Sequence, residues 1–108
     1  MEGFLLTFYT QQNRMHGDLQ VANWILEEAR QLGIRGATLA TAREGFGHDG
    51  RFHSENYFDL EDRPQQVVMA VTEDECNHLL GRLEENGPRV FYTKSRIEFG
   101  FTGEPGAS

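Results

Sequence analysis

The sequence has 108 residues, which fits one domain and excludes an enzyme built from two lobes with a cleft between them. Hydrophobic residues make up 38% and charged residues 25%, a composition typical of a globular chain rather than a disordered one. The formal net charge of −7 disfavours a general nucleic-acid surface, because phosphate binding requires a basic field.

Cysteine usage and the N-terminal segment indicate in which cellular compartment the protein is expected. Cys76 is the only cysteine, so no intrachain disulfide and no Cys-rich metal site can form. The first residues lack the basic start and long apolar run of a signal peptide, and no stretch reaches the ~20 apolar residues of a membrane span. We therefore expect a cytoplasmic protein without direct membrane insertion.

The chain begins with a predicted strand followed by a predicted helix. Residues 3–10 alternate as a strand does, whereas residues 11–17 have no periodicity and are predicted to form a loop. Asp18 is predicted to cap the helix. The apolar positions of this helix recur at helical spacing: Leu19, Ala22, Leu26, Ala29 and Leu32.

The end of this helix and the next strand are also predicted. Gly33 is expected to end the helix in the left-handed conformation, with Ile34 folding back onto Ala29 as in a Schellman motif. Residues 36–44, rich in Ala and Thr, are predicted to form the second strand. Residues 45–56 contain three glycines among polar residues, which predicts a long, mobile loop.

The second half of the chain repeats the order strand, helix, strand. Residues 67–71 are an apolar run that predicts a strand buried on both faces. Residues 72–75 (Thr-Glu-Asp-Glu) form a capping box, and residues 86–88 (Asn-Gly-Pro) are expected to end the helix. Residues 89–101 are predicted to be the last strand and residues 102–108 a tail. The apolar stripe of this helix is Cys76, Leu79, Leu80 and Leu83.

The order of these elements predicts an α+β fold of the ferredoxin-like type, βαββαβ. Right-handed crossovers would place both helices on one face of a four-stranded antiparallel sheet. We expect a single domain over residues 1–101, followed by the tail.

The face of the sheet without helices is predicted to be apolar, because most strands carry apolar residues on both sides. A bare apolar face of this kind exceeds what monomers usually expose. Self-association about a symmetry axis is the simplest cover. Two alternatives are that residues 45–63 or the tail fold over the sheet, and that a different protein binds there, which would make the chain a structural subunit.

Short motifs give the chain a resemblance to a known family. They occur in order along the chain: Arg14-Met15-His16-Gly17, Gly36-Ala37-Thr38, Gly45-Phe46-Gly47, Arg51-Phe52-His53 and Thr102-Gly103-Glu104. Together, on matching elements, they resemble the PII signalling superfamily over residues 4–101. The resemblance is nearest to a PII-like branch that is a domain-of-unknown-function family.

The resemblance implies a homotrimer with small-molecule ligands, commonly adenine nucleotides, in the clefts between subunits. It also implies that residues 45–56 are an effector loop that contacts a protein partner, such as a membrane transporter or a regulatory enzyme. The ligand-binding candidates are Gly36, Ala37, Thr38, Gly45, Phe46, Gly47, Arg51, His53 and Arg89. Further candidates are Arg14, His16, Thr102, Gly103 and Glu104.

One departure from the superfamily narrows the expected ligand. The connection at residues 85–89 lacks the glycine run whose amide groups cradle a polyphosphate, and Arg89 is the one cation placed to replace it. This favours a nucleotide with fewer phosphates, or another small anion, over ATP.

Two other classes of protein come into question besides a ligand-binding regulator: a metal-binding protein and an enzyme. Imidazoles and carboxylates suit Zn or Cu(II), so a metal-binding or metal-tolerance protein of the same fold is the alternative function. Its candidate ligands are Glu44, His48, Asp49 and His53. No nucleophile motif such as Gly-x-Ser-x-Gly is present, and we expect the protein not to be an enzyme.

Overall fold

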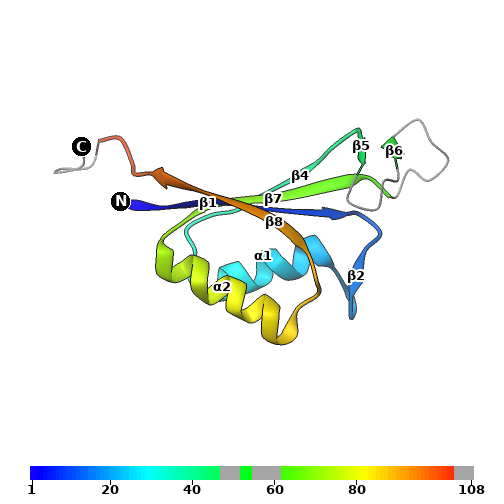
Figure 1. The fold of residues 1–108 in the computed structure, drawn as a ribbon, viewed down its shortest axis with the longest axis horizontal. Coiled ribbons are helices and arrows are strands. Elements are labelled where there is room, and N and C mark those ends of the chain that lie inside the picture. Colours follow the sequence, from blue (N-terminus) through cyan, green and yellow to red (C-terminus); the bar gives the residue numbers. More distant parts are fainter. Residues whose placement is uncertain (47–51, 55–61, 104–108) are drawn as a thin grey trace.

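The computed structural model describes residues 1–46, 52–54 and 62–103 (Figure 1). Its main elements follow the predicted order, and two short hairpins are added to them. The main elements are β1 (Glu2–Gln11), α1 (Val21–Gln31), β4 (Thr38–Thr41), β7 (Pro64–Val71), α2 (Glu73–Asn86) and β8 (Phe91–Glu98). The hairpins are β2 (Met15–His16) with β3 (Leu19–Gln20), and β5 (Glu44–Phe46) with β6 (Phe52–Ser54).

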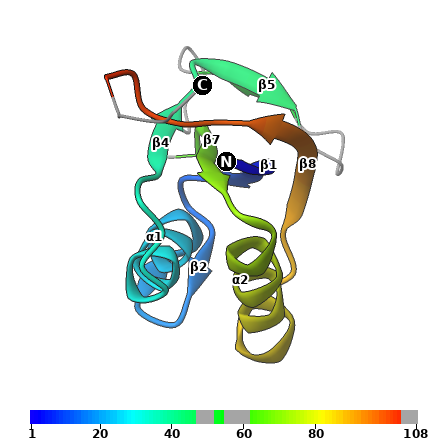
Figure 2. The ribbon, with the colours of Figure 1, turned by 90° about the vertical axis from the view of Figure 1, so that its left-hand side faces the viewer.

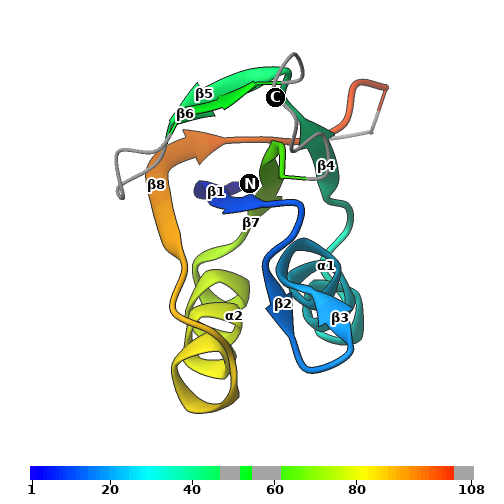
Figure 3. The same cartoon turned by 90° about the vertical axis from the view of Figure 1, so that its right-hand side faces the viewer.

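The main sheet has the strand order β4-β7-β1-β8, and every neighbouring pair in it is antiparallel. In the central strand, Phe8 is level with Val67 of β7 on one side and Tyr92 of β8 on the other. Both described helices lie on the same face of this sheet, which leaves the opposite face open (Figures 2 and 3). The structure therefore confirms the ferredoxin-like prediction.

The core lies between the sheet and the two helices. Leu6 and Phe8 of β1 are fully buried, as are Ile25 of α1 and Cys76 and Leu79 of α2. Burial also raises the pKa of the Cys76 thiol, so the group stays protonated at neutral pH. Cys76 is thus a small core residue, as its place on the apolar stripe predicts.

The helix ends confirm the predicted stop and start signals. Gly33 has φ +77°, and the N–H of Ile34 donates to the carbonyl of Ala29 at 3.1 Å, which is a Schellman motif. Thr72 Oγ1 accepts from the N–H of Glu75 at 3.2 Å, while the Glu75 carboxylate accepts from the N–H of Thr72 at 2.9 Å. The capping box is therefore formed.

The predicted loop at residues 11–17 and the predicted cap at Asp18 are wrong. Residues 15–20 form the β2–β3 hairpin, and Asp18 lies in its turn beside Gly17, which has φ +64°. The helix begins only at Val21, after Gln20, whose side chain makes no capping hydrogen bond. Residues 15–20 could begin a helix or form a tight turn flanked by two paired residues on each side, and the structure shows the turn.

Four further features differ from the prediction. The second strand is shorter than residues 36–44, since β4 covers only Thr38–Thr41. The predicted loop 45–56 contains β-structure, because Glu44–Phe46 pair with Phe52–Ser54. The run at residues 67–71 is buried on one face only within the single chain, with Val68 and Ala70 half-buried. The last strand ends at Glu98 rather than at residue 101.

The open face of the sheet is apolar only in part. Leu5, Tyr9 and Phe91 point outward there and are 38%, 36% and 58% exposed, but Thr7 and Thr93 separate them across the strands. Residues 99–103 leave β8 and cross this face toward the β4 edge, at the end where β1 begins (Figures 2 and 3). The chain's own C-terminal segment therefore covers one end of the face and leaves the rest open.

The crossing depends on Gly3. A Cβ at this position would lie 1.9 Å from the carbonyl oxygen of Val71 and 2.9 Å from the ring of Phe99. Only a residue without a side chain lets the Phe99 ring and the Val71 carbonyl approach the strand this closely.

The outer edge strand, β8, differs from the other long strands in exposure. Of its residues, only Ile97 is half-buried, and all others are exposed. On the helix side, Lys94 Nζ and Arg96 Cζ lie 4.8 and 5.1 Å from the centre of the Phe4 ring. These contacts anchor the strand through cation–π interactions.

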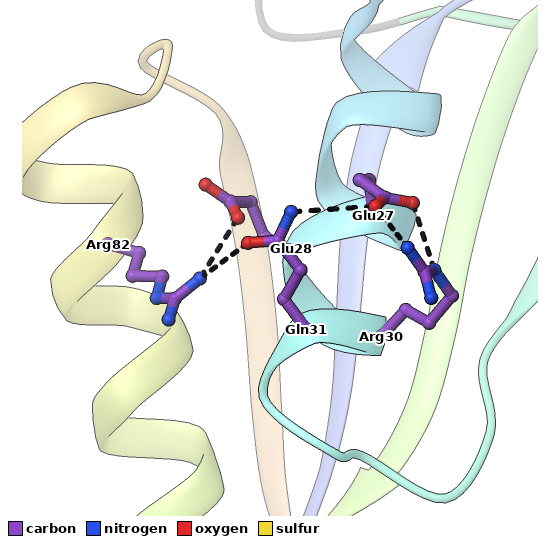
Figure 4. Close-up of polar contacts among 5 residues, drawn as sticks. All are labelled: Glu27, Glu28, Arg30, Gln31 and Arg82. Carbon is purple, nitrogen blue, oxygen red and sulfur yellow. Dashed lines mark hydrogen bonds and ion pairs between the residues drawn. The ribbon is translucent and has the colours of Figure 1, made fainter.

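A bridge between the helices completes the fold (Figure 4). Arg82 of α2 donates to the carboxylate of Glu28 at 3.1 Å and to the side chain of Gln31 at 3.2 Å. Within α1, Arg30 pairs with Glu27, and this contact lowers the pKa of the Glu27 carboxyl. Such exposed pairs contribute little to stability, so the helices are held mainly by the core.

Gly81→Ala is expected to stabilise the fold by about 0.5–1 kcal/mol, because glycine is a poor residue in a helix interior. Gly81 lies inside α2, and nothing lies within 4 Å of a Cβ built there. Urea unfolding followed by circular dichroism measures the change. A loss of stability would mean that this face of α2 is closely packed in solution.

Candidate functional site

The predicted ligand-binding residues of the described chain fall into two groups, at opposite edges of the sheet. The first group lies at the β4 edge. Gly36 and Thr38 are exposed there, and Ala37 is half-buried against the core. The crossing segment, residues 99–103, runs toward this edge (Figure 3), and its Thr102 and Gly103 are exposed.

The second group lies beside the β8 edge, where α2 ends. The Arg14 guanidinium donates to the carbonyl of Arg89. His16 Nε2 donates to the carbonyl of Asn86 at 2.9 Å, and its ring meets the Trp24 ring edge-on at 5.1 Å. Arg14 and His16 thus fasten the β2–β3 hairpin to the end of α2, which gives both a structural role.

A shallow pocket of about 420 Å³ adjoins this second group. Arg89 lines it together with apolar side chains of α2 and β8, including Leu80, Leu83 and Tyr92. The Arg89 side chain is exposed, so it can meet an anion at the rim. Its backbone is fixed by the contact with Arg14.

The remaining candidates belong to the segment that follows β4. The backbone pairs Gly45 with His53 and Phe46 with Phe52. Gly47, Arg51 and Glu104 lie outside the described residues, as do the metal candidates His48 and Asp49. Among the side chains that the structure describes, no group of three or more His, Cys, Asp or Glu is placed to hold a metal ion.

One residue at the first group was not predicted. The Arg35 guanidinium lies over two aromatic rings of the crossing segment, with Cζ 5.9 Å from the centre of the Phe99 ring and 5.7 Å from that of Phe101. This contact joins the turn before β4 to the C-terminal segment. The alternation of aromatic residues with Gly100 is the only sequence signal that could have indicated it.

The two groups cannot meet within one chain. They lie on the edge strands β4 and β8, with β7 and β1 between them. Three strand spacings separate such edges by roughly 14 Å. A compact site that includes both groups would need two copies of the chain, each supplying a different edge.

Comparisons with known proteins identify the relatives of this chain. The family model DUF190, described as "Uncharacterized ACR, COG1993", matches residues 3–99. A search of curated proteins finds no match. Of the helices in the described ranges, none is long and apolar enough to cross a membrane.

Solved structures of PII-like proteins share the fold. The PII-like protein TTHA0516 from Thermus thermophilus has a TM-score of 0.65 and 21% identity, over 89% of this chain and 87% of its own. CPII, a nitrogen regulatory PII-like protein from Thiomonas intermedia bound to ADP, AMP and bicarbonate, has a TM-score of 0.57 and 20% identity, over 97% and 92%. The predicted resemblance to the PII-like branch is confirmed, and at these identities the structures show a shared fold.

Proposed function

The chain belongs to the DUF190 family, and from this membership and the geometry of its site we propose that it is a PII-like regulatory protein. It assembles as a homotrimer and binds a small anionic metabolite, an adenine nucleotide with one or two phosphates, in clefts between subunits. Residues 45–56 then regulate a protein partner, either a membrane transporter or a regulatory enzyme.

The crossing of the open face by residues 99–103 is the observation that carries this proposal. Through Arg35 and its two aromatic partners, it brings Thr102 and Gly103 toward Gly36 and Thr38. The contact of Arg35 with Phe99 and Phe101 thus links the segments that lead into two motifs predicted to contact the ligand. A link between segments that are distant in sequence is what we expect where both contribute to one ligand site.

The position of the second group supports a site shared between subunits. Arg89 and its neighbours lie on the far edge, so a neighbouring copy must supply them. The exposed apolar residues Leu5, Tyr9 and Phe91 on the open face supply a surface for that association. The ligand class follows the nucleotides bound to CPII, a protein with the same fold.

The partner surface follows from the place of the β5–β6 hairpin. Its two strands continue from the end of β4 beyond the main sheet (Figure 1). The paired backbones of Glu44–Phe46 and Phe52–Ser54 can meet a partner there without disturbing the main sheet. Ligand binding regulates the partner only through different affinities for two states of this segment.

The proposal is tested by sedimentation and titration of the purified chain. We expect a homotrimer by analytical ultracentrifugation, and saturable binding of AMP or ADP by isothermal titration calorimetry in a panel that includes ATP, cyclic nucleotides and bicarbonate. Chromatography of the nucleotide after incubation is expected to recover it unchanged, as for a regulator. A stable monomer would contradict the assembly, and a trimer that binds no member of the panel would contradict the ligand class.

Gly36→Val gives a sharper test of where the ligand lies. Nothing in the folded chain lies within 4 Å of a Cβ at Gly36, so the added side chain enters open space and leaves the fold intact. We expect it to abolish or strongly weaken nucleotide binding by filling the cleft. Gly81→Ala, remote from this edge, is the control and should bind as the unmodified chain does. Equal binding by both variants would place the ligand elsewhere.

A further inference from the structure

Two aromatic rings are the contacts that orient Arg35 within the described part of the chain. Its Cζ lies within 6 Å of the centres of both the Phe99 and the Phe101 ring, the range in which cation–π attraction operates. The rings attract the positive charge without providing an oxygen acceptor for its N–H groups. The side chain is therefore oriented, while no residue in the ranges 1–46, 52–54 and 62–103 accepts a hydrogen bond from it.

Three of the arginines described above direct their donors to the protein. Arg30 donates to Glu27, and Arg82 donates to Glu28 and Gln31 (Figure 4). Arg14 donates to the carbonyl of Arg89. Arg35, in contrast, is exposed and makes neither a hydrogen bond nor an ion pair with any residue that the structure describes. A guanidinium carries five donors in a planar fork that matches the oxygens of a phosphate or carboxylate.

The surroundings of Arg35 leave room for such a group. Gly36 follows it directly, and Gly100 lies between the two rings in sequence. At each of these glycines, and at Gly103, nothing lies within 4 Å of a Cβ position. An anion can therefore approach the guanidinium and the neighbouring backbone without meeting a side chain at these three positions.

We propose that Arg35 binds the phosphoryl oxygens of the adenine nucleotide in the site assigned above, and that Phe99 and Phe101 position it for this contact. The inference rests on the proposed function, since it names the residue that recognises the anionic part of that ligand. It also gives the crossing segment a role, because displacing residues 99–101 would release the guanidinium.

The test compares ADP, AMP and adenosine by calorimetry on the full chain. Arg35→Ala is expected to weaken ADP binding by about 10-fold or more, because a charge-assisted fork of hydrogen bonds is lost, and to leave adenosine binding unchanged. Arg35→Lys keeps the charge without the fork and should lose less. Phe101→Leu should weaken ADP binding by about 3-fold through looser positioning. Arg30→Ala removes an exposed arginine from α1 and is the matched control.

Each outcome separates the inference from the function on which it rests. If the unmodified chain binds no nucleotide, the proposed function fails. If it binds ADP and Arg35→Ala binds ADP equally well, the function stands and the role of Arg35 is overturned. Equal losses for ADP and adenosine would also overturn it, because Arg35 would then act on the shape of the site. Thermal unfolding checks that the variants fold, and Arg35→Gln replaces Arg35→Ala if the latter does not.

Discussion

Leu6→Ala is expected to lower the free energy of unfolding by about 2–5 kcal/mol. Leu6 is fully buried in β1, the strand that lies between β7 and β8 at the centre of the sheet. Removing its side chain leaves a cavity beneath the two helices that the sheet cannot close without losing its pairing. Since domains of this size have only ~5–15 kcal/mol of stability, the loss should be plain in urea unfolding.

Leu19→Ala is the matched control, with the same atoms removed from a side chain that is 43% exposed. Leu19 lies in the β2–β3 hairpin, before the helix begins. Its loss should change stability by no more than about 0.5 kcal/mol. A loss of stability as large as that of Leu6→Ala would mean that Leu19 is buried on the apolar stripe of a longer helix, which would contradict the hairpin.

Gly3→Ala should be comparably severe, with an expected cost of about 3 kcal/mol from overpacking. The new methyl group would lie 1.9 Å from the Val71 carbonyl oxygen, a contact with backbone that no rotamer change can relieve. Either β1 moves away from β7, or the Phe99 ring is expelled from its place. Unfolding in urea measures the stability, and ADP titration measures the second effect, since a displaced Phe99 no longer orients Arg35.

Gly100→Ala is the control for Gly3→Ala. Gly100 lies one residue beyond Phe99, and nothing lies within 4 Å of a Cβ there. Its stability should stay within about 0.5 kcal/mol of the unmodified chain. If Gly3→Ala were as mild, the close approach of β1, Val71 and Phe99 would not exist in solution.

The sequence predicts the parts of this fold whose signals are local and chemically specific. The Thr72–Glu75 box can satisfy its own backbone donors in only one conformation, and Gly33 meets the left-handed requirement of a helix end. The apolar stripe from Cys76 to Leu83 likewise identifies the buried face of α2. Strand and helix order then determine the topology through the right-handed crossover rule.

The hairpins escape prediction because their strands are too short to show alternation. Met15–His16 and Leu19–Gln20 contribute two residues each, and Glu44–Phe46 and Phe52–Ser54 three. Asp18 therefore resembles a helix cap, although Gly17 next to it forms a turn. Periodicity needs several repeats, whereas a hairpin needs only a turn and a few paired residues.

For the ligand site, the sequence names candidate residues but does not show how they are arranged. Sequence motifs identify Gly36–Thr38 and Arg89, yet only the strand order shows that they lie at opposite edges. Arg35 was missed because its partners, Phe99 and Phe101, are far away in sequence, and the contact depends on the chain leaving β8 early to cross the open face.

The exposure of β8 has a consequence for how the molecule avoids fibre formation. An edge strand offers unpaired peptide groups to any other extended chain, and its eight residues are long enough to template one. Lys94 and Arg96 occupy alternate positions of this strand. An incoming strand would have to bury or approach both positive charges. This cost disfavours uncontrolled addition of strands to β8, and so disfavours amyloid-like growth from this edge.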